Sequence, residues 1–519
     1  MNIINNPEEF LKIGETISPA EQYFERIRKQ TGLFVGPLAG FVLYLIPLQN
    51  INSQAHTLAA ILLWIVIWWI TEPIPIPISA LMGAVLCVIF GVGDVKKVFI
   101  PFADPLIYLF LGSFIISKSM SIHGLDRRFA YNILSLKWIG SRPGRILFVF
   151  GAITAFISMW ISNTATTAMM LPIGVGIISV INRMIEAKSG TEIDSANIRF
   201  STGLMLMAAY AASAGGIGTP VGTPPNLIGM AMLEKYLNIK IPFFQWMSFS
   251  IPLLILMYFA LFFILFYLHK PSVKKLEGIS EFIIDEKKKL GLWSRGQKNS
   301  LIAFAVTVFL WILPGILAVV FSTDSSIYKA YNTYFPEAVA AIVGASLLFV
   351  LPINWKERKF TIEWEQAVKI DWGTLILFGG GLSLGNLMFE TKLAEAIGKG
   401  LLEFGGVDSM WGITLAAIFI SIFVSEATSN TASANMIIPV IISISLAANL
   451  NPVPPAIGAT LGASWGFMLP VSTPPNAIVY GSGLVPITKM IRAGIIFDLI
   501  GGILIWLGLR ILLPLTGLS

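Results

Sequence analysis

The chain alternates long apolar runs with short polar segments. The runs lie at residues 33–48, 55–70, 76–92, 104–121, 145–181, 200–232 and 246–268 in the first half, and at 300–321, 336–352, 371–390, 411–448, 455–482 and 485–514 in the second. Most are long enough to cross, or nearly cross, about 30 Å of hydrocarbon. Two amphipathic segments, 125–139 and 391–404, are too polar to span and should lie at the membrane surface. The pattern predicts an all-α polytopic membrane protein with about eleven transmembrane helices.

Two runs in each half are interrupted by the same two phrases, in the same order. Ser162-Asn163-Thr164-Ala165 matches Ser429-Asn430-Thr431-Ala432, and Pro220–Asn226 (PVGTPPN) matches Pro470–Asn476 (PVSTPPN). Two unusual phrases that recur in order indicate an internal repeat. Halves with an odd number of crossings insert with opposite orientations, so we expect two inverted-topology repeats, each with a re-entrant hairpin whose tip is the Ser-Asn-Thr segment.

Composition narrows the class of protein. The 519 residues are 55% hydrophobic and only 12% charged, which is too apolar for a soluble enzyme. The net charge of +6 comes from basic residues in short loops rather than from one stripe, so nucleic-acid binding is not expected. The single cysteine, Cys87, excludes an internal disulfide or a multi-cysteine metal site.

The distribution of charge predicts the orientation. If the N-terminus is cytoplasmic, most of the 35 Lys and Arg residues fall in loops on the cytoplasmic side of the membrane, where basic residues are normally in excess. Residues 1–30 are mostly polar, so we expect no secretory signal peptide there, and Ser18-Pro19-Ala20-Glu21 predicts the start of a short amphipathic helix at the membrane surface. We expect a multi-pass protein of the cell (inner) membrane with a cytoplasmic N-terminus.

The interrupted runs are the candidate functional elements. A helix is broken at membrane depth only where protein or a water-filled cavity satisfies its backbone, and its free ends then favour anions (N–H groups) or cations (carbonyl groups). Small polar residues often only pack helices together, but two matched copies with paired Thr-Pro-Pro-Asn favour a functional role. No Lys, Arg or His lies in the four phrases, so a bound anion would be neutralised best by co-bound cations such as Na⁺.

These motifs resemble the divalent anion/sodium symporter family, which carries dicarboxylates, citrate or sulfate, and the resemblance spans nearly the whole chain. It implies a homodimer in which a scaffold holds the two subunits together while a transport domain slides in an elevator motion. Segments 125–139 and 391–404 look like the arms that join the two parts. The implied ligands are a dicarboxylate and Na⁺, with no other cofactor.

The family's site residues carry over to matching positions here. The substrate site implied by the resemblance comprises Ser162, Asn163, Thr164, Thr223, Ser429, Asn430, Thr431, Thr473 and Pro474. The implied first sodium site comprises Ser158, Asn163 and the backbone around Gly222, and the second comprises Ser425, Thr428 by its carbonyl, Asn430 and the backbone of Ser472.

The resemblance also implies a function and a division of the chain. Thr431 stands where citrate-preferring members often have an apolar residue, which favours four-carbon dicarboxylates such as succinate, malate and fumarate. Sodium-independent exchange, and citrate or sulfate as substrate, remain alternatives. The expected parts are a cytoplasmic segment (1–30), scaffold and first arm (31–143), first transport half (144–245), scaffold with linker 269–299 and second arm (246–410), and second transport half (411–519).

Other signals favour structural roles. A membrane-embedded enzyme would need a nucleophile, metal or acid–base set, and the sequence shows none. A channel would need a continuous pore rather than two inverted half-sites. Gly462–Gly466 (GASWG) matches a nucleophile elbow but lacks the strand and the partners. The three histidines form no metal-spaced cluster. Glu426, four residues before Asn430, is the notable intramembrane charge; it could couple protons, but an ion pair or hydrogen bonds that brace the hairpin are favoured.

Overall fold

The fold is nearly all helical, as expected. The computed structural model describes residues 19–48, 51–189, 199–271, 275–276, 278–405 and 409–518. In this part, nine helices are long and apolar enough to cross a membrane. A tenth span results if α15 (Ser326–Tyr334) and α16 (Glu337–Val350), which are bent by 58° relative to each other, count as one. Three shorter apolar helices accompany them: α4 (Ile76–Ile89), α8 (Pro143–Ser158) and α22 (Val453–Ala463). This confirms a polytopic membrane fold.

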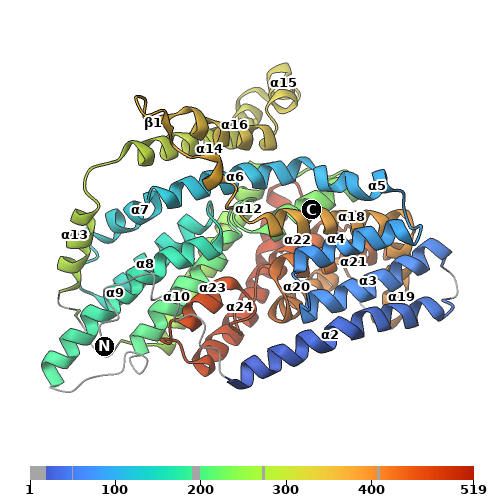
Figure 1. Cartoon of the computed structure of the whole chain (residues 1–519), viewed down its shortest axis with the longest axis horizontal. Helices are drawn as coiled ribbons and strands as arrows, with labels where there is room; N and C mark the ends of the chain where they lie inside the picture. Colours follow the sequence, from blue (N-terminus) through green and yellow to red (C-terminus); the bar gives the residue numbers. More distant parts are fainter. Residues whose placement is uncertain are drawn as a thin grey trace.

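Within the described residues, the first half has eleven α-helices and one 3₁₀ helix, whose arrangement is drawn in Figure 1. They are α2 (Pro19–Leu45), α3 (Ser53–Thr71), α4 (Ile76–Ile89), α5 (Val95–Phe99), η2 (Ile100–Ala103), α6 (Pro105–Ile122), α7 (Leu125–Leu134), α8 (Pro143–Ser158), α9 (Asn163–Ser189), α10 (Arg199–Gly216), α11 (Pro224–Leu237) and α12 (Phe243–Leu268).

The second half follows the same order after a linker helix. Its elements are α13 (Ile279–Lys289), α14 (Arg295–Phe321), α15 (Ser326–Tyr334), α16 (Glu337–Val350), the antiparallel pair β1 (Pro352–Asn354) and β2 (Lys359–Phe360), α17 (Trp364–Ala367), α18 (Trp372–Glu390), α19 (Leu393–Gly405), α20 (Met410–Ala427), α21 (Asn430–Ala447), α22 (Val453–Ala463), α23 (Pro474–Gly481) and α24 (Ile487–Leu515).

Two expectations need correction. The predicted start at Pro19 is present, but the helix runs on without a break into the first apolar run, so α2 is one long helix rather than a short surface helix; residues 1–18 lie outside the described part. The first arm helix is shorter than predicted and ends at Leu134. The linker 269–299, for which no helix was predicted, contains α13 and the first turn of α14.

The two halves interlock by exchanging partners. Helix α4 of the first half packs on α18 of the second, and α16 of the second packs on α6 of the first. The same exchange occurs between the broken helices, because α11 contacts α21 and α22 while α23 contacts α9 and α10. Such reciprocal contacts are expected when two repeats are related by a pseudo-two-fold axis.

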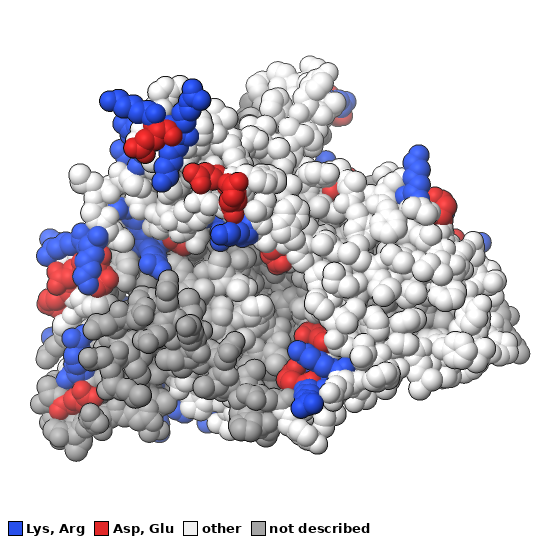
Figure 2. Space-filling model, viewed as in Figure 1, with Lys and Arg blue, Asp and Glu red and all other residues white. Residues whose placement is uncertain are grey.

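The surface is consistent with a lipid environment. Figure 2 shows acidic and basic side chains gathered in groups toward the left and top of this face and at its lower centre, while most of its right half is uncharged. Large apolar side chains of α2, among them Phe34, Leu38 and Phe41, are more than half exposed. Exposed apolar area on this scale is expected where lipid rather than water is the neighbour.

Candidate functional site

The first hairpin breaks between α8 and α9. Helix α8 ends at Ser158 and α9 begins at Asn163, so the predicted motif is the start of a helix. The Ser158 hydroxyl donates a hydrogen bond of 2.7 Å to Oδ1 of Asn163 across the break. The Ser162 hydroxyl accepts from the amide of Ala165 at 3.3 Å, as an N-cap does.

The first broken helix meets this hairpin at Gly216. Helix α10 ends at Gly216, and α11 begins at Pro224 after an irregular loop. A Cβ atom on Gly216 would lie 2.6 Å from Oδ1 of Asn163, and one on Gly222 would lie 2.4 Å from the Gly216 carbonyl oxygen. The structure therefore brings the hairpin tip and the loop together at a position where only glycine fits.

The second hairpin repeats this geometry. Helix α20 ends at Ala427 and α21 begins at Asn430. The Ser425 hydroxyl donates to Oδ1 of Asn430 at 2.9 Å, and the Ser429 hydroxyl accepts from Ala432 N at 3.2 Å. The Thr428 hydroxyl, however, donates to the carbonyl of Trp69 in α3 at 2.7 Å, a contact with a helix far away in the sequence.

The second broken helix also closes on its hairpin. Helix α22 ends at Ala463 and α23 begins at Pro474, with Thr473 as the N-cap that accepts from Asn476 N at 3.3 Å. A Cβ atom on Gly466 would lie 3.2 Å from the Ser425 hydroxyl. The loop therefore packs directly on the hairpin beside Ser425.

Two asparagines that the sequence reasoning left out of the site hold these loops closed. The Asn226 amide donates to the carbonyls of Gly216 at 3.0 Å and Thr219 at 2.7 Å. The Asn476 amide donates to those of Gly466 at 3.4 Å and Leu469 at 3.0 Å. Both side chains are fully buried. The signal was in the sequence, because each Asn ends a repeated phrase.

Eight helix ends lie at the four breaks and supply the local electrostatics. The breaks form two half-sites, the first at α8–α9 and α10–α11 and the second at α20–α21 and α22–α23. Helices α9, α11, α21 and α23 begin at the predicted phrases, whereas α8, α10, α20 and α22 end beside them. N-terminal N–H groups favour anions and C-terminal carbonyls favour cations. The arrangement can therefore hold an anion and cations together without a basic side chain.

Accessibility differs among the predicted substrate residues. Ser162, Asn163, Ser429 and Asn430 are half-buried, and Thr164 and Pro474 are exposed. Thr223, Thr431 and Thr473 are buried. A ligand can thus reach the two Ser-Asn pairs, Thr164 and Pro474. The two halves are not identical, because Thr164 is exposed where Thr431 is buried.

Glu426 braces the second half-site through hydrogen bonds. Its carboxylate accepts from the amides of Met468 at 2.9 Å and Leu469 at 3.2 Å, and from the Ser472 hydroxyl. Of the two structural roles expected for Glu426, the structure supports the hydrogen-bonded brace. Within the described residues, no group of three or more His, Cys, Asp or Glu side chains could hold a metal ion.

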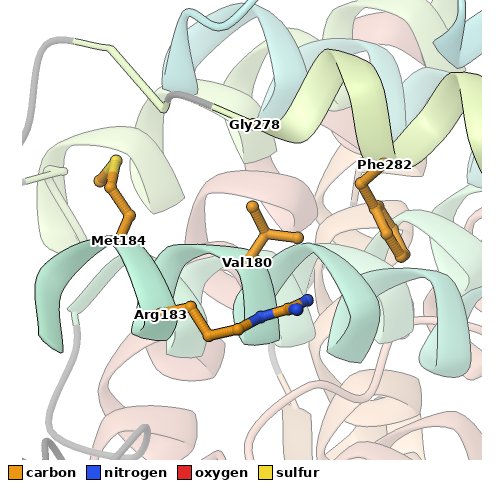
Figure 3. Close-up of a pocket in the computed structure, with 5 residues that line it drawn as sticks. All are labelled: Val180, Arg183, Met184, Gly278 and Phe282. Carbon is orange, nitrogen blue, oxygen red and sulfur yellow. The ribbon is translucent and has the colours of Figure 1, made fainter. Parts of the chain in front are cut away.

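A cavity of about 540 Å³ lies away from the breaks. Figure 3 shows Val180 and Met184 of α9 pointing toward the side of Gly278 and Phe282 at the start of α13, while Arg183 extends along α9. This end of α9 is remote from Asn163, so the cavity is not part of either half-site.

Known proteins resemble this chain over nearly its whole length. Residues 28–514 match the family model described as the sodium:sulfate symporter transmembrane region. The sodium-dependent dicarboxylate transporter SdcS of Staphylococcus saprophyticus is 36% identical over 487 residues, which cover 93% of this chain and 91% of that protein. SdcS of Staphylococcus aureus (strain MRSA252) is 33% identical over 506 residues, 95% and 94% of the two chains.

Two solved transporters share the fold. The YdaH transporter of Alcanivorax borkumensis is 13% identical with a TM-score of 0.52 and covers 81% of this chain and 87% of its own. MtrF of Neisseria gonorrhoeae is 12% identical with a TM-score of 0.51 and covers 97% of both chains. At such identities only the fold is shared. From the family match and the two SdcS proteins, the chain belongs to the sodium:sulfate symporter family, the divalent anion/sodium symporters that its motifs resemble, and it is a transporter rather than an enzyme.

Proposed function

We propose that the protein is a secondary active transporter that carries four-carbon dicarboxylates together with Na⁺. The observation that carries the proposal is the pair of matched half-sites, in each of which a Ser hydroxyl bonds Oδ1 of the motif Asn beside a broken helix. The SdcS relatives are named sodium-dependent dicarboxylate transporters, which supports the same substrate class here.

Each half-site offers oxygen ligands suited to Na⁺. In the first, these are the oxygens of Ser158 and Asn163 with the backbone near Gly222; in the second, they are those of Ser425 and Asn430 with the backbone of Thr428 and Ser472. Amide, hydroxyl and carbonyl oxygens are the ligands of hard cations. Two bound Na⁺ ions would offset the charge of a dianion and so lower its desolvation cost.

The dicarboxylate would lie between the half-sites. The hydroxyls and amides of the two Ser-Asn pairs can donate to one carboxylate each, and the N-termini of α9 and α21 favour negative charge at the same places. Thr431 places a hydroxyl rather than an apolar side chain at the second half-site, which favours succinate, malate or fumarate over citrate. Citrate or sulfate transport is the alternative within the family.

We propose an elevator motion in a homodimer with a cytoplasmic N-terminus. The moving part would comprise residues 144–245 and 411–519, and the scaffold 31–143 and 246–410, with α7 and α19 as the joining arms. Helix α12 of the scaffold contacts α8, α10 and α24 of the moving part, so it would lie at the boundary between the two parts. The bond from Thr428 to Trp69 would then be a contact between the two parts that changes during transport.

Uptake of labelled succinate into proteoliposomes tests the proposal. We expect uptake that requires an inward Na⁺ gradient and is lost in both Asn163→Ala and Asn430→Ala, while both variants keep their size-exclusion profile. Uptake that is driven only by internal dicarboxylate would identify a sodium-independent exchanger instead. No uptake of succinate, citrate or sulfate under either condition would overturn the transport proposal for these anions.

A further inference from the structure

A second buried carboxyl group lies behind the second half-site. Asp498, in the middle of α24, is 4% exposed. The backbone amide of Phe467 is a nearby donor, but neither carboxyl oxygen makes a well-aligned hydrogen bond with a described residue. The loop after α22 lies across this part of α24. A Cβ atom on Gly494 would be 2.5 Å from Cα of Met468, and one on Gly501 would be 2.0 Å from Nε1 of Trp465.

The nearest acidic neighbour of Asp498 is Glu426. The two side chains are close enough to form a hydrogen bond with each other. Both oxygens of Glu426 already accept hydrogen bonds from the loop, from the amides of Met468 and Leu469 and from the Ser472 hydroxyl. Glu426 therefore has three donors that stabilise a carboxylate, whereas Asp498 has only the poorly aligned amide of Phe467 among the described residues.

No cation of the surrounding helices neutralises the pair. Helices α12, α20 and α22 pack on α24, and none of the three contains a Lys, Arg or His. The other titratable side chain that faces the pair is Tyr210 of α10, whose hydroxyl bonds the carbonyls of Phe467 and Met490. The basic residues of α24 itself, Lys489, Arg492 and Arg510, lie toward its two ends.

Two buried carboxylates in contact cannot both carry a charge without a strong penalty, because desolvation and repulsion act together. They can form a hydrogen bond only if one of them keeps its proton. We propose that Asp498 is that group: a neutral carboxylic acid at physiological pH that donates a hydrogen bond to the Glu426 carboxylate and fixes its position.

The position of Glu426 matters for the second half-site. Glu426 follows Ser425, whose hydroxyl bonds Asn430, and it holds Ser472, whose backbone is a candidate Na⁺ ligand. Asp498 thus acts as a positioning residue that touches neither ion nor substrate. This role rests on the proposed sodium coupling, whereas the protonation state of Asp498 does not.

Infrared difference spectroscopy of the purified protein tests the protonation state directly. We expect Asp498→Asn, compared with the unchanged protein at pH 7, to lose a carbonyl-stretch band of a neutral carboxylic acid. Glu390→Gln is the control, because Glu390 is half exposed and forms an ion pair of 2.8 Å with Lys97; it should leave that region unchanged. An Asp498→Asn spectrum with no loss in that region would overturn the proposal.

The sodium dependence of succinate uptake tests the positioning role. Asp498→Asn keeps a neutral donor, so its half-saturating Na⁺ concentration should stay within about twofold of the original, whereas Asp498→Leu should raise it about tenfold, or about 1.4 kcal/mol. Loss of uptake in the Asn variant, or an unchanged Na⁺ requirement in a folded Leu variant, would contradict this role. If Asp498→Leu does not fold, the Asn variant and the spectrum still decide. If the unchanged protein takes up no succinate, the proposed function fails, and the spectrum still tests Asp498.

Discussion

Replacing Asn226 by Ala removes the clamp of the first broken helix. The amide of this fully buried side chain donates to the carbonyls of Gly216 and Thr219. The Thr219 carbonyl keeps a second donor, the amide of Gly222 at 3.3 Å. Loss of the Asn226 hydrogen bond to Thr219 therefore costs what one ordinary hydrogen bond contributes, about 1 kcal/mol. No other described group donates to the Gly216 carbonyl, and leaving it unpaired costs about 1–3 kcal/mol.

The two losses together cost about 2–4 kcal/mol. They should destabilise the first half-site rather than the whole fold, because the loop between α10 and α11 can open without unfolding either helix. Since 1.4 kcal/mol is a factor of ten, we expect the half-saturating Na⁺ concentration for succinate uptake to rise at least about tenfold. Uptake into proteoliposomes over a Na⁺ series measures it, and thermal unfolding in detergent with and without Na⁺ gives a second reading that does not need transport.

A matched control lies at the other end of the same helix. Asn238 follows α11 as an exposed residue in the left-handed conformation, with φ of 56°, which glycine adopts without strain. Asn238→Gly should therefore leave the Na⁺ dependence unchanged. If Asn226→Ala and Asn238→Gly gave the same half-saturating concentration, the clamp would have no role in binding the ion.

Three further predictions concern Gly216, Glu426 and His269. Gly216→Ala should abolish uptake, because its Cβ would lie 2.6 Å from Oδ1 of Asn163, whereas Gly400→Ala, with nothing within 4 Å, should be active. Glu426→Gln replaces one accepting oxygen by an NH₂ group, which cannot accept from the loop groups that now donate to the carboxylate. Uptake should therefore fall about tenfold. Full uptake with an unaltered pH dependence would exclude both the brace and proton coupling. Burial, and then nearby positive charges, lower the pKa of His269 to about 4 from its ordinary value of 6.5. The unfolded chain then binds more protons between these values, so stability should fall as the pH drops from about 6.5 to about 4. The unfolding temperature of His269→Gln should vary less over that range; equal variation would contradict the role of His269.

The sequence by itself determined the class of protein and the places where its helices break. Apolar runs must match the hydrocarbon thickness. A break at that depth requires residues that interrupt the helix, such as proline, or that satisfy the freed backbone hydrogen-bonding groups, such as Ser, Thr and Asn. For this reason the starts of α9 and α21 fall at Asn163 and Asn430, and those of α11 and α23 at Pro224 and Pro474, inside the predicted phrases. The order of elements was readable for the same reason, since it occurs twice.

Elements outside the hydrocarbon were less predictable. The polar start of α2 reads as a separate surface helix, yet nothing between it and the apolar run stops the helix, and the two form one. Helix α13 lies in the charged linker, where apolar periodicity is weak. Its C-terminal end is held by contacts from far away, because Arg128 of α7 donates to the carbonyls of Leu290, Gly291 and Leu292.

Only the tertiary structure decided which residues meet within the half-sites. Asn226 and Asn476 fold back onto loops that precede them, and Gly216 is required because Asn163 approaches it from another hairpin. Glu426 and Asp498 face each other from different helices although both lie in apolar runs. Sequence periodicity reports which side of one helix is apolar, but a contact between helices depends on how the repeats cross, and that is set by packing over the whole fold.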